Sequence, residues 1–365
     1  MVLNPSAIGT NETPVALNEE KLHQFVGKMV NEMGAAVTAP LVLIGDKLGL
    51  YRALAKNGPM DARQLAAATN TGERYITEWL ASQAASGYID YDPASQTFSM
   101  TPEQVAVFAD EHSPYLMTGA YYSMASVYRD EPKLAEAFKT DAGIPWGNHD
   151  GCLFCGVAKF FRPGYEANLI QSWIPALPGV GERLRAGANV ADIGCGFGIS
   201  TIIMAKHYPK SRFYGFDIHA ESIDEARKLA ANEGLTNITF EVATAKSFPG
   251  NDYDLIACFD SLHDMGDPAG AASYIYSKLR DEGSWMIVEP FAHDDLEQNL
   301  NPIGRVYYAY SAQVCTPTSL SQEVGAALGA QAGERKLRDI IEPAGFRSVR
   351  RAAETPFNLI LQAVR

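Results

Sequence analysis

Apolar residues follow helical spacing through most of the first hundred residues and then give way to alternation. The helical stretches cover residues 18–55, 61–69 and 71–86, and we expect the first to be interrupted at Pro40. Residues 88–101 alternate apolar and polar positions around a DPAS turn, which is typical of a β-hairpin. The pattern therefore predicts helices followed by a short hairpin.

Short apolar runs alternate with amphipathic stretches from Asn189 onward, which predicts an α/β domain with a doubly wound sheet. Only Pro356 and Phe357 separate the last two runs. Because parallel strands need a much longer connection, we expect this final pair to form an antiparallel hairpin. The runs that we interpret as strands are 189–195, 212–218, 238–244, 253–261, 284–290, 348–355 and 358–365.

These patterns divide the chain into four parts. Three helices and a hairpin are the arrangement of a winged helix, and the helices of residues 18–55 have apolar faces with little to pack on in so small a domain. We expect these faces to pair across a two-fold axis and form a homodimer. The parts are a loose tail at 1–16, a winged-helix dimerisation domain at 17–112, a helical connector at 113–180 and the α/β domain at 181–365.

The chain is acidic, with a formal net charge of −13. This charge disfavours nucleic acids and anionic membranes as partners, and residues 71–86, which would read DNA, carry one arginine beside two glutamates. The five cysteines are an odd number without framework spacing, which favours reduced thiols. With no signal-peptide pattern and no apolar stretch long enough to span a bilayer, we expect a cytoplasmic protein.

The first strand of the α/β domain runs into a glycine-rich loop, DIGCGFGIS. A dinucleotide fingerprint would need glycine at position 199, where isoleucine stands, so the pyrophosphate-binding pattern is incomplete. Instead Gly198 completes a G-x-G-x-G series, and Asp192 precedes it. A carboxylate there would repel a pyrophosphate and attract an ammonium group. The alternative is that the glycines only allow the next helix to pack closely.

This loop, Asp217 at the end of the next strand and the terminal hairpin together resemble the class I S-adenosylmethionine-dependent methyltransferases. The resemblance implies a Rossmann-like, seven-stranded sheet whose last hairpin is antiparallel, and S-adenosyl-L-methionine as cofactor with S-adenosyl-L-homocysteine as product. It also implies that Asp192 and residues 194–198 surround the methionine moiety and that Asp217 accepts both ribose hydroxyls. The chemistry agrees, because the cofactor carries an ammonium, a sulfonium and a diol but no phosphate.

The third strand ends in Ala243-Thr244-Ala245, where many members of the family have Asp-Ala. We expect Thr244 to hydrogen-bond the adenine and Phe248 to stack on it. The candidate cofactor-binding residues are Asp192, Gly194, Cys195, Gly196, Gly198, Asp217, Ile218, Thr244, Ala245, Phe248 and Asp260.

The segment DSLHDMGDP places His263 and Asp264 just after the fourth strand, at the carboxyl edge of the sheet. A neutral imidazole there is suited to removing a proton from a methyl acceptor. Here the chain resembles the winged-helix small-molecule O-methyltransferases, such as the plant phenolic and hydroxyindole enzymes, and their uncharacterised bacterial relatives. The resemblance implies that His263 deprotonates the acceptor hydroxyl and that the N-terminal domain dimerises.

In that family two acidic residues hold the histidine. The first maps onto Glu289, whereas near the second stand Gln331 and, as the nearest acid, Glu334. Met265 replaces the usual tryptophan after the His-Asp pair. The alternative interpretation is that His263 only caps the following helix, together with Asp264 and Asp267.

The long insertion at 293–333 is typical of a lid or a binding loop. Aromatic residues of the insertion and the connector are candidates for the acceptor pocket, although aromatics at helical spacing are often core residues. The candidates are Tyr121, Tyr122, Trp146, Phe161, Tyr307, Tyr310 and Cys315. The segment HDGCLFC offers His149, Cys152 and Cys155, but a zinc site wants four ligands, so we expect no metal.

We therefore expect a dimeric S-adenosylmethionine-dependent methyltransferase that acts at oxygen on a small, largely apolar acceptor, with His263 as general base supported by Asp264 and Glu289. Two alternatives remain. One is methylation at nitrogen or carbon, without a general base. The other is a cofactor-sensing regulator that uses the winged helix on DNA, which the charge of residues 71–86 disfavours.

Overall fold

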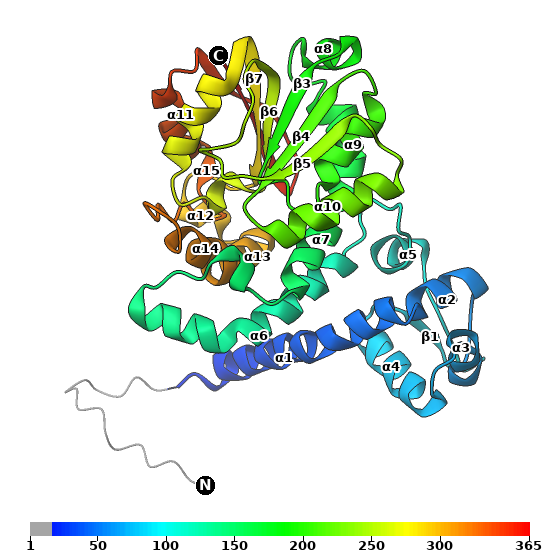
Figure 1. Cartoon of the computed structure of the whole chain (residues 1–365). Helices are drawn as coiled ribbons and strands as arrows, with labels where there is room; N and C mark the ends of the chain where they lie inside the picture. The colour runs from blue at the N-terminus through cyan, green and yellow to red at the C-terminus, as the bar shows by residue number, and fades with distance from the viewer. Residues whose placement is uncertain (1–16) are drawn as a thin grey trace, which may run out of the picture.

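A computed structural model describes residues 17–365 (Figure 1), so the predicted tail at 1–16 lies outside the described residues. Asn18 caps helix α1 (Glu19–Lys47), which continues through Pro40. The expected interruption at Pro40 was wrong. A proline removes only one helical hydrogen bond. The neighbouring turn is also held by a contact from outside the helix, since the Trp79 indole donates to the Leu41 carbonyl at 2.9 Å. The helix ends instead before Gly49, which has a φ of 71°.

The winged helix predicted from the sequence is present. Asp61 and Gln64 form a capping box at the start of helix α3. Its core includes Tyr51 and Trp79, whose rings meet edge to face at 5.1 Å between centroids. The elements are α2 (Leu50–Asn57), α3 (Ala62–Thr69), α4 (Glu73–Ala85), β1 (Asp90–Asp92), β2 (Thr97–Ser99) and α5 (Pro102–Phe108).

Two long helices, α6 (Thr118–Thr140) and α7 (Cys152–Asn168), form the connector and lie between the winged helix and the α/β domain (Figure 1). They pack closely: a Cβ atom added to Gly119 would lie 2.4 Å from the backbone nitrogen of Phe160. A short η1 turn (Trp146–Asn148) joins them, and η2 (Leu169–Trp173) and α8 (Val180–Ala186) lead into the sheet.

The α/β domain is built on a seven-stranded sheet in the order β5-β4-β3-β6-β7-β9-β8. The first five strands of this sheet, β3 to β7, are parallel, and β9 runs antiparallel to both β7 and β8, which confirms the predicted terminal hairpin. The strands are β3 (Asn189–Ile193), β4 (Arg212–Asp217), β5 (Ile238–Val242), β6 (Tyr253–Phe259), β7 (Leu279–Pro290), β8 (Ser348–Glu354) and β9 (Asn358–Val364).

Several predicted strands were a residue or two too long, because the apolar runs continue into the loops at the carboxyl edge. Conversely, β7 begins at Leu279, five residues before its predicted start, because Leu279 pairs with Tyr253 across a register shift. Helices cover both faces: α9 (Ile199–His207), α10 (Ala220–Asn232), α11 (Pro268–Lys278) and α15 (Gly333–Ile341), with η3 (Leu262–Asp264) after β6 and η5 (Glu342–Ala344) before β8.

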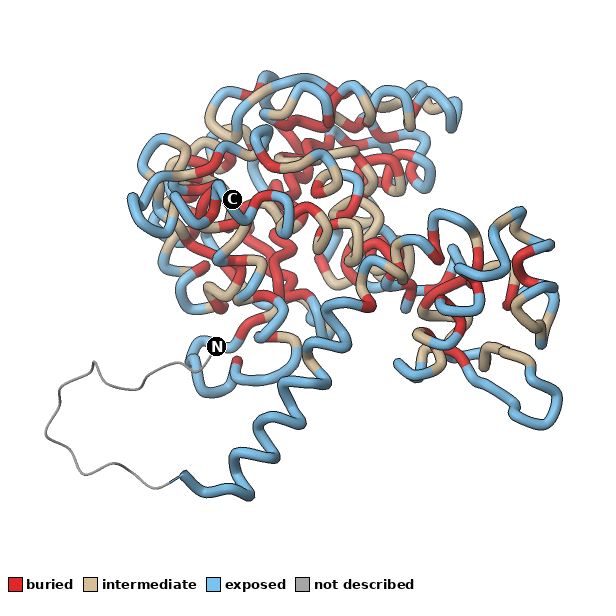
Figure 2. Tube along the Cα trace, turned by 90° about the horizontal axis from the view of Figure 1, so that it is seen from below, coloured by how far each residue is buried: buried red, intermediate tan, exposed pale blue. Residues whose placement is uncertain are grey.

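Buried residues concentrate in the sheet and on its two faces, whereas much of α1 is exposed (Figure 2). Every residue of β6 is buried, as expected of a central parallel strand. Neighbouring β3 and β6 are not consecutive in the chain, so the sheet reverses its winding between them. Open α/β sheets bind their ligands at the carboxyl ends of the strands at such a point.

The insertion folds as a layer of short elements over the connector (Figure 1). Leu153 of α7 shares a buried apolar cluster with Tyr307, Val314 and Cys315 of the insertion. Its elements are α12 (Leu296–Asn299), α13 (Pro302–Tyr310), η4 (Ser311–Cys315) and α14 (Thr316–Leu320).

In the part of the chain that the structure describes, no single helix is both long and apolar enough to cross a bilayer. The bent pair α1 and α2, at 64° to one another, meets the length and composition criteria only when the two are taken together.

Candidate active site

A cavity of about 570 Å³ lies at the carboxyl ends of β3, β4 and β6, with α7 as its opposite wall. Its size falls within the range of small-molecule sites in proteins. The wall is contributed by the loops that follow these strands, by the loop after β5, and by α14 of the insertion. The fold therefore places the cavity where a doubly wound sheet binds its ligand.

The glycine-rich loop forms one side of the cavity. Gly194, Cys195 and Gly196 line it, as predicted, whereas Gly198 does not. Gly198 has a φ of 71°, and an added Cβ would lie 2.4 Å from the Phe240 ring, so its role is to let the loop turn into α9. A Cβ on Gly196 would meet nothing within 4 Å, which leaves its backbone accessible to a ligand.

Asp217 is placed as predicted, at the end of β4 and on the cavity wall. Its Oδ2 accepts the amide hydrogen of Gly196 and its Oδ1 that of His219, each at 2.8 Å. Burial raises the pKa of Asp217, and the amides of His219 and Gly196 oppose this shift. Each oxygen keeps a lone pair, so the carboxylate can accept both hydroxyls of a diol.

Asp192 does not line the cavity, contrary to the expectation that it contacts the ligand. It is fully buried, and its Oδ2 accepts the hydroxyls of Ser200 and Thr201 at 2.6 Å each. Both donors lie in the first turn of α9, so Asp192 ties this helix to β3. Burial raises the pKa of Asp192 to about 6, although these two hydrogen bonds lower it.

On the side expected to hold adenine, Ile218, Thr244 and Ala245 line the cavity. Phe248 does not: it is fully buried in the core and packs on Phe216 with ring centroids 5.4 Å apart. The expected stacking of Phe248 on the base was therefore wrong, because the chain turns this side chain under the sheet edge.

Asp260 lies on the cavity wall beyond β6, with an unusual positive φ of 49°. The Tyr165 hydroxyl donates to its Oδ2 at 2.7 Å, and the Asn358 amide donates to its Oδ1 at 3.1 Å. Burial and the nearby charge of Glu289 raise the pKa of Asp260 to about 8. Sequence reasoning missed Tyr165 and Asn358, since neither lies near Asp260 in the chain.

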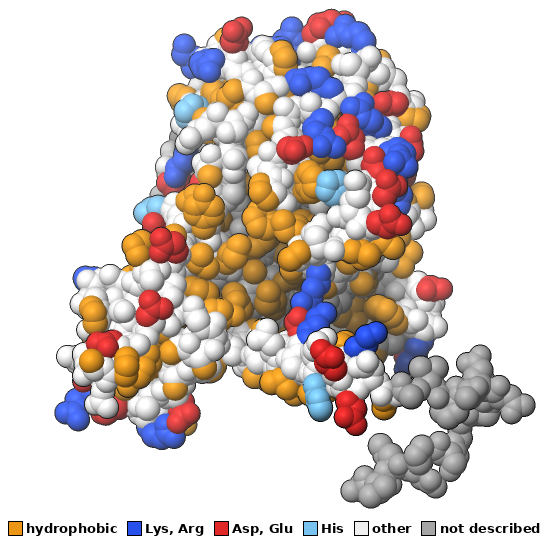
Figure 3. Space-filling view, turned by 180° about the vertical axis from the view of Figure 1, so that it is seen from behind, with side chains coloured by type: hydrophobic (Ala, Val, Ile, Leu, Met, Phe, Trp, Pro, Cys, Tyr) orange, Lys and Arg blue, Asp and Glu red, His pale blue; other side chains and the backbone are white. Residues whose placement is uncertain are grey.

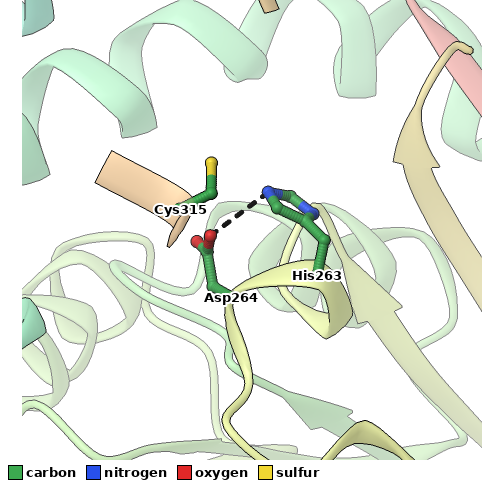
Figure 4. Close-up of side chains that lie close together, drawn as sticks. All are labelled: His263, Asp264 and Cys315. Atoms are coloured by element: carbon green, nitrogen blue, oxygen red, sulfur yellow. Dashed lines mark ion pairs between the residues drawn. The ribbon is translucent and has the colours of Figure 1, made fainter. Parts of the chain in front are cut away.

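His263 is held between the carboxyl groups of Glu289 and Asp264, the second of which is drawn in Figure 4. Its Nδ1 lies 2.6 Å from Glu289 Oε2, as the expected role of Glu289 requires, and its Nε2 lies 3.3 Å from Asp264 Oδ1. Burial lowers the pKa of His263, but the charges of Glu289 and Asp264 raise it well above its usual value. Of these three residues only Asp264 lines the cavity.

The alternative role of His263 as a helix cap is contradicted. Asp267 caps α11 by accepting the Gly270 amide hydrogen at 2.8 Å, and His263 makes no such contact. A second acidic partner from the insertion is not found either. Gln331 donates to the carbonyls of Phe291 and Ala330, and Glu334 pairs with Arg338 and Arg351 on the surface.

Of the acceptor-pocket candidates, Trp146 and Phe161 line the cavity, whereas Tyr307, Tyr310 and Cys315 do not. Tyr307 donates to the Phe357 carbonyl at 2.8 Å and Tyr310 lies 2.8 Å from the Ser123 hydroxyl, so both hold the insertion in place. Tyr121 and Tyr122 also lie outside the wall.

Several lining residues were not predicted. The polar run after Cys315, TPTSLSQE, was a signal that could have been used, because such side chains at a helix end often face a ligand. The missed residues include Phe154, Val157, Ala158, Thr318, Gln322 and Glu323.

The histidine and the two cysteines of the segment HDGCLFC lie outside the cavity wall. Both ring nitrogens of His149 have partners, since Nδ1 lies 3.1 Å from Asp130 and Nε2 lies 3.3 Å from the Thr318 hydroxyl. Cys152 and Cys155 both remain free thiols.

Comparisons with known proteins agree with this geometry. Residues 184–344 match a family model described as "Methyltransferase domain", and residues 35–109 match an "Rv2258c-like winged HTH domain". A curated relative, the uncharacterized methyltransferase YcgJ of Bacillus subtilis, is 28% identical over 126 residues, which are 33% of this chain and 49% of that protein. The chain thus spans about half the length of this relative.

Solved structures resemble the chain over nearly its whole length. A candidate O-methyltransferase of Nostoc punctiforme has a TM-score of 0.71 at 18% identity, covering 93% of this chain and 98% of that one. Human N-acetylserotonin methyltransferase, solved with S-adenosylmethionine, has a TM-score of 0.66 at 18% identity, covering 98% and 99%. Residues 35–109 are thus similar to an Rv2258c-like winged helix-turn-helix domain and residues 184–344 to a methyltransferase domain, and the chain has the fold of these solved methyltransferases.

Proposed function

We propose that the chain transfers the methyl group of S-adenosylmethionine to an oxygen atom of a small acceptor. The observation that carries this proposal is that Asp217 and Asp264 line one cavity, the first bonded to the glycine loop and the second beside His263. One region suits the cofactor, and the other suits an acceptor that must lose a proton.

The residues present fit the cofactor. Asp217 can accept the two ribose hydroxyls, and the exposed backbone at Gly196 leaves room beside them. The carboxyl groups of Asp192 and Asp217 place negative charge at this end of the sheet, which favours a cation over a phosphate. When bound, S-adenosylmethionine supplies an electrophilic methyl group on its sulfonium.

The chain's own part in the reaction is to position the acceptor and take its proton. Asp264 lines the cavity and lies 3.3 Å from Nε2 of His263, so the acceptor hydroxyl can give its proton to Asp264, which passes it on to His263. Glu289 fixes the imidazole through Nδ1 and stabilises the imidazolium that forms. His263 is thus the proposed general base.

The acceptor is proposed to be largely apolar. The wall beyond the cofactor region is formed by Trp146, Phe154, Val157 and Phe161, which offer stacking and apolar contact but no charge. A hydroxylated aromatic or quinol-like molecule fits such a wall. Methylation at nitrogen or carbon would leave the Glu289–His263–Asp264 arrangement without a use, which is why oxygen is preferred.

The test is transfer of labelled methyl from S-adenosylmethionine to a panel of phenols, catechols and hydroxyquinones. We expect label in at least one hydroxylated acceptor with the wild-type protein, and we expect that label to be lost with Asp217→Ala. Label that enters only amines or carbon nucleophiles would overturn O-methylation, and no cofactor binding at all would overturn methyl transfer.

We also propose that a second copy of the chain covers helix α1. Seven large apolar side chains between residues 22 and 37 of this helix are exposed, and hydrophobic side chains also gather in a hollow between the α/β domain and the N-terminal part (Figure 3). So long an apolar stripe is typical of an interface. The seven are Leu22, Phe25, Val26, Met29, Val30, Met33 and Val37.

DNA regulation is the weaker candidate. The single arginine of α4, Arg74, is paired with Glu78 at 2.5 Å, which removes its charge from phosphate contact.

The free state of all five cysteines supports the cytoplasmic location that we propose.

A further inference from the structure

Three potential metal ligands from two distant parts of the chain meet beside the cavity. His263 and Asp264 come from η3 and Cys315 from η4, and their ligand atoms all lie within 4.8 Å of one another (Figure 4). Asp264 Oδ1 is buried and has no hydrogen-bond partner among the described residues. It pairs with Nε2 of His263 at 3.3 Å, and a cation placed between the two atoms would bind both of them.

The distances suit a tetrahedral ion. Zinc binds imidazole nitrogen and carboxylate oxygen at about 2.0–2.1 Å, so two such ligands in a tetrahedron lie roughly 3.3–3.4 Å apart. Nε2 of His263 and Oδ1 of Asp264 are 3.3 Å apart. The sulfur needs only a rotation or small shift of the Cys315 side chain, on the order of 1 Å, to complete a third vertex.

The next layer of contacts is also that of a metal site. Glu289 Oε2 lies 2.6 Å from Nδ1 of His263, and Glu289 Oε1 accepts the Leu262 amide hydrogen at 3.0 Å. A carboxylate that receives the Nδ1 hydrogen fixes the tautomer whose free lone pair is on Nε2. The imidazole is therefore oriented with its ligating nitrogen toward Asp264 and Cys315.

We propose that His263 Nε2, Asp264 Oδ1 and Cys315 Sγ bind a divalent ion of the zinc type. One thiolate, one imidazole and one carboxylate select zinc or cobalt over magnesium or calcium. Because Asp264 lines the cavity, the fourth coordination position faces it and takes water or an acceptor heteroatom. The ion and the proposed base use the same nitrogen, so a bound ion prevents His263 from accepting a proton. A bound ion and proton transfer to His263 therefore exclude one another, and metal binding is measured apart from methyl transfer.

The test is titration of the purified full-length protein with Co²⁺, read as a thiolate-to-cobalt charge-transfer band in the near ultraviolet together with visible bands of tetrahedral intensity. One equivalent is expected, displaced by Zn²⁺. Cys315→Ser should abolish the near-ultraviolet band. Glu289→Gln should weaken binding by about 10–100-fold through loss of ligand orientation.

Cys155→Ser is the matched control, since Cys155 is an exposed thiol in the connector segment that also holds His149 and Cys152. It should leave the band intact. The proposal is overturned if the wild-type protein gives no thiolate band, if the band survives Cys315→Ser, or if it disappears with Cys155→Ser. Circular dichroism and cofactor binding check the folding of each variant, and the wild-type spectrum decides the matter even if Cys315→Ser does not fold.

Discussion

Nδ1 of His263 lies 2.6 Å from Oε2 of Glu289, and both side chains are buried. His263 follows β6 and Glu289 lies near the end of β7. These strands are parallel neighbours, so the register of the sheet brings the two residues together. Glu289 also accepts the Leu262 amide hydrogen, which fixes the turn that carries His263. The ring orientation is thus set by the sheet itself.

If His263 removes the acceptor's proton, His263→Ala should lower turnover by about 10²–10⁴-fold, the usual contribution of general base catalysis. Glu289→Gln should cause a smaller loss, through misorientation of the ring. Cofactor affinity should hardly change, because His263 does not line the cavity. Raising the pH should partly rescue His263→Ala with a phenolic acceptor. Near-normal turnover of a folded His263→Ala protein would refute the base role.

Asp217→Ala should weaken S-adenosylmethionine binding by roughly tenfold or more, because each charge-assisted hydrogen bond to a hydroxyl contributes about 1.5–3 kcal/mol. Isothermal titration calorimetry measures this change. Asp224→Ala is the control, since Asp224 is an exposed carboxylate on the following helix that pairs with Arg227. Equal affinity for the two variants would remove Asp217 from the site.

The stability of the cofactor-free protein should fall as pH rises, in part through Asp260. Its pKa is about 8 in the folded protein against a usual value of 3.8, because burial and Glu289 disfavour the charged form. The folded state therefore binds this proton more tightly, and the stabilisation present at low pH is lost as pH rises toward 8.

Asp260→Asn should remove that part of the dependence. Urea unfolding at pH 6 and pH 8.5 should show a smaller loss of unfolding free energy for Asp260→Asn than for wild type. Asp224→Asn serves as the exposed control and should behave as wild type. Identical losses for all three proteins would contradict the assigned pKa.

Substitution on the exposed apolar stripe of α1 should break the proposed dimer. Phe25 and Val30 are 60% and 63% exposed in the single chain, so a second copy can cover them. Phe25→Glu with Val30→Glu should convert a dimer to a monomer in light scattering at micromolar concentration. Tyr75→Glu, at an 83% exposed position on α4, should leave the dimer intact. A wild-type monomer would refute the proposal.

The sequence alone determined the features that depend on short stretches of chain. Two residues between the last strands exclude a parallel connection, so the antiparallel hairpin was predictable. The glycine loop and Asp217 follow successive strands, and parallel strands bring their carboxyl ends to one edge. Periodicity likewise predicted the winged helix, although not that α1 would continue through Pro40.

Only the tertiary structure decided which side chains meet across the cavity. Phe248 turned into the core and Tyr307 and Tyr310 became supports of the insertion, because neither periodicity nor composition tells which face of an element borders a ligand. Tyr165 reaches Asp260 from α7, and Cys315 reaches His263 from η4. Such contacts depend on the path of the connector and the insertion over the sheet, which the packing of the whole chain sets and no local pattern encodes.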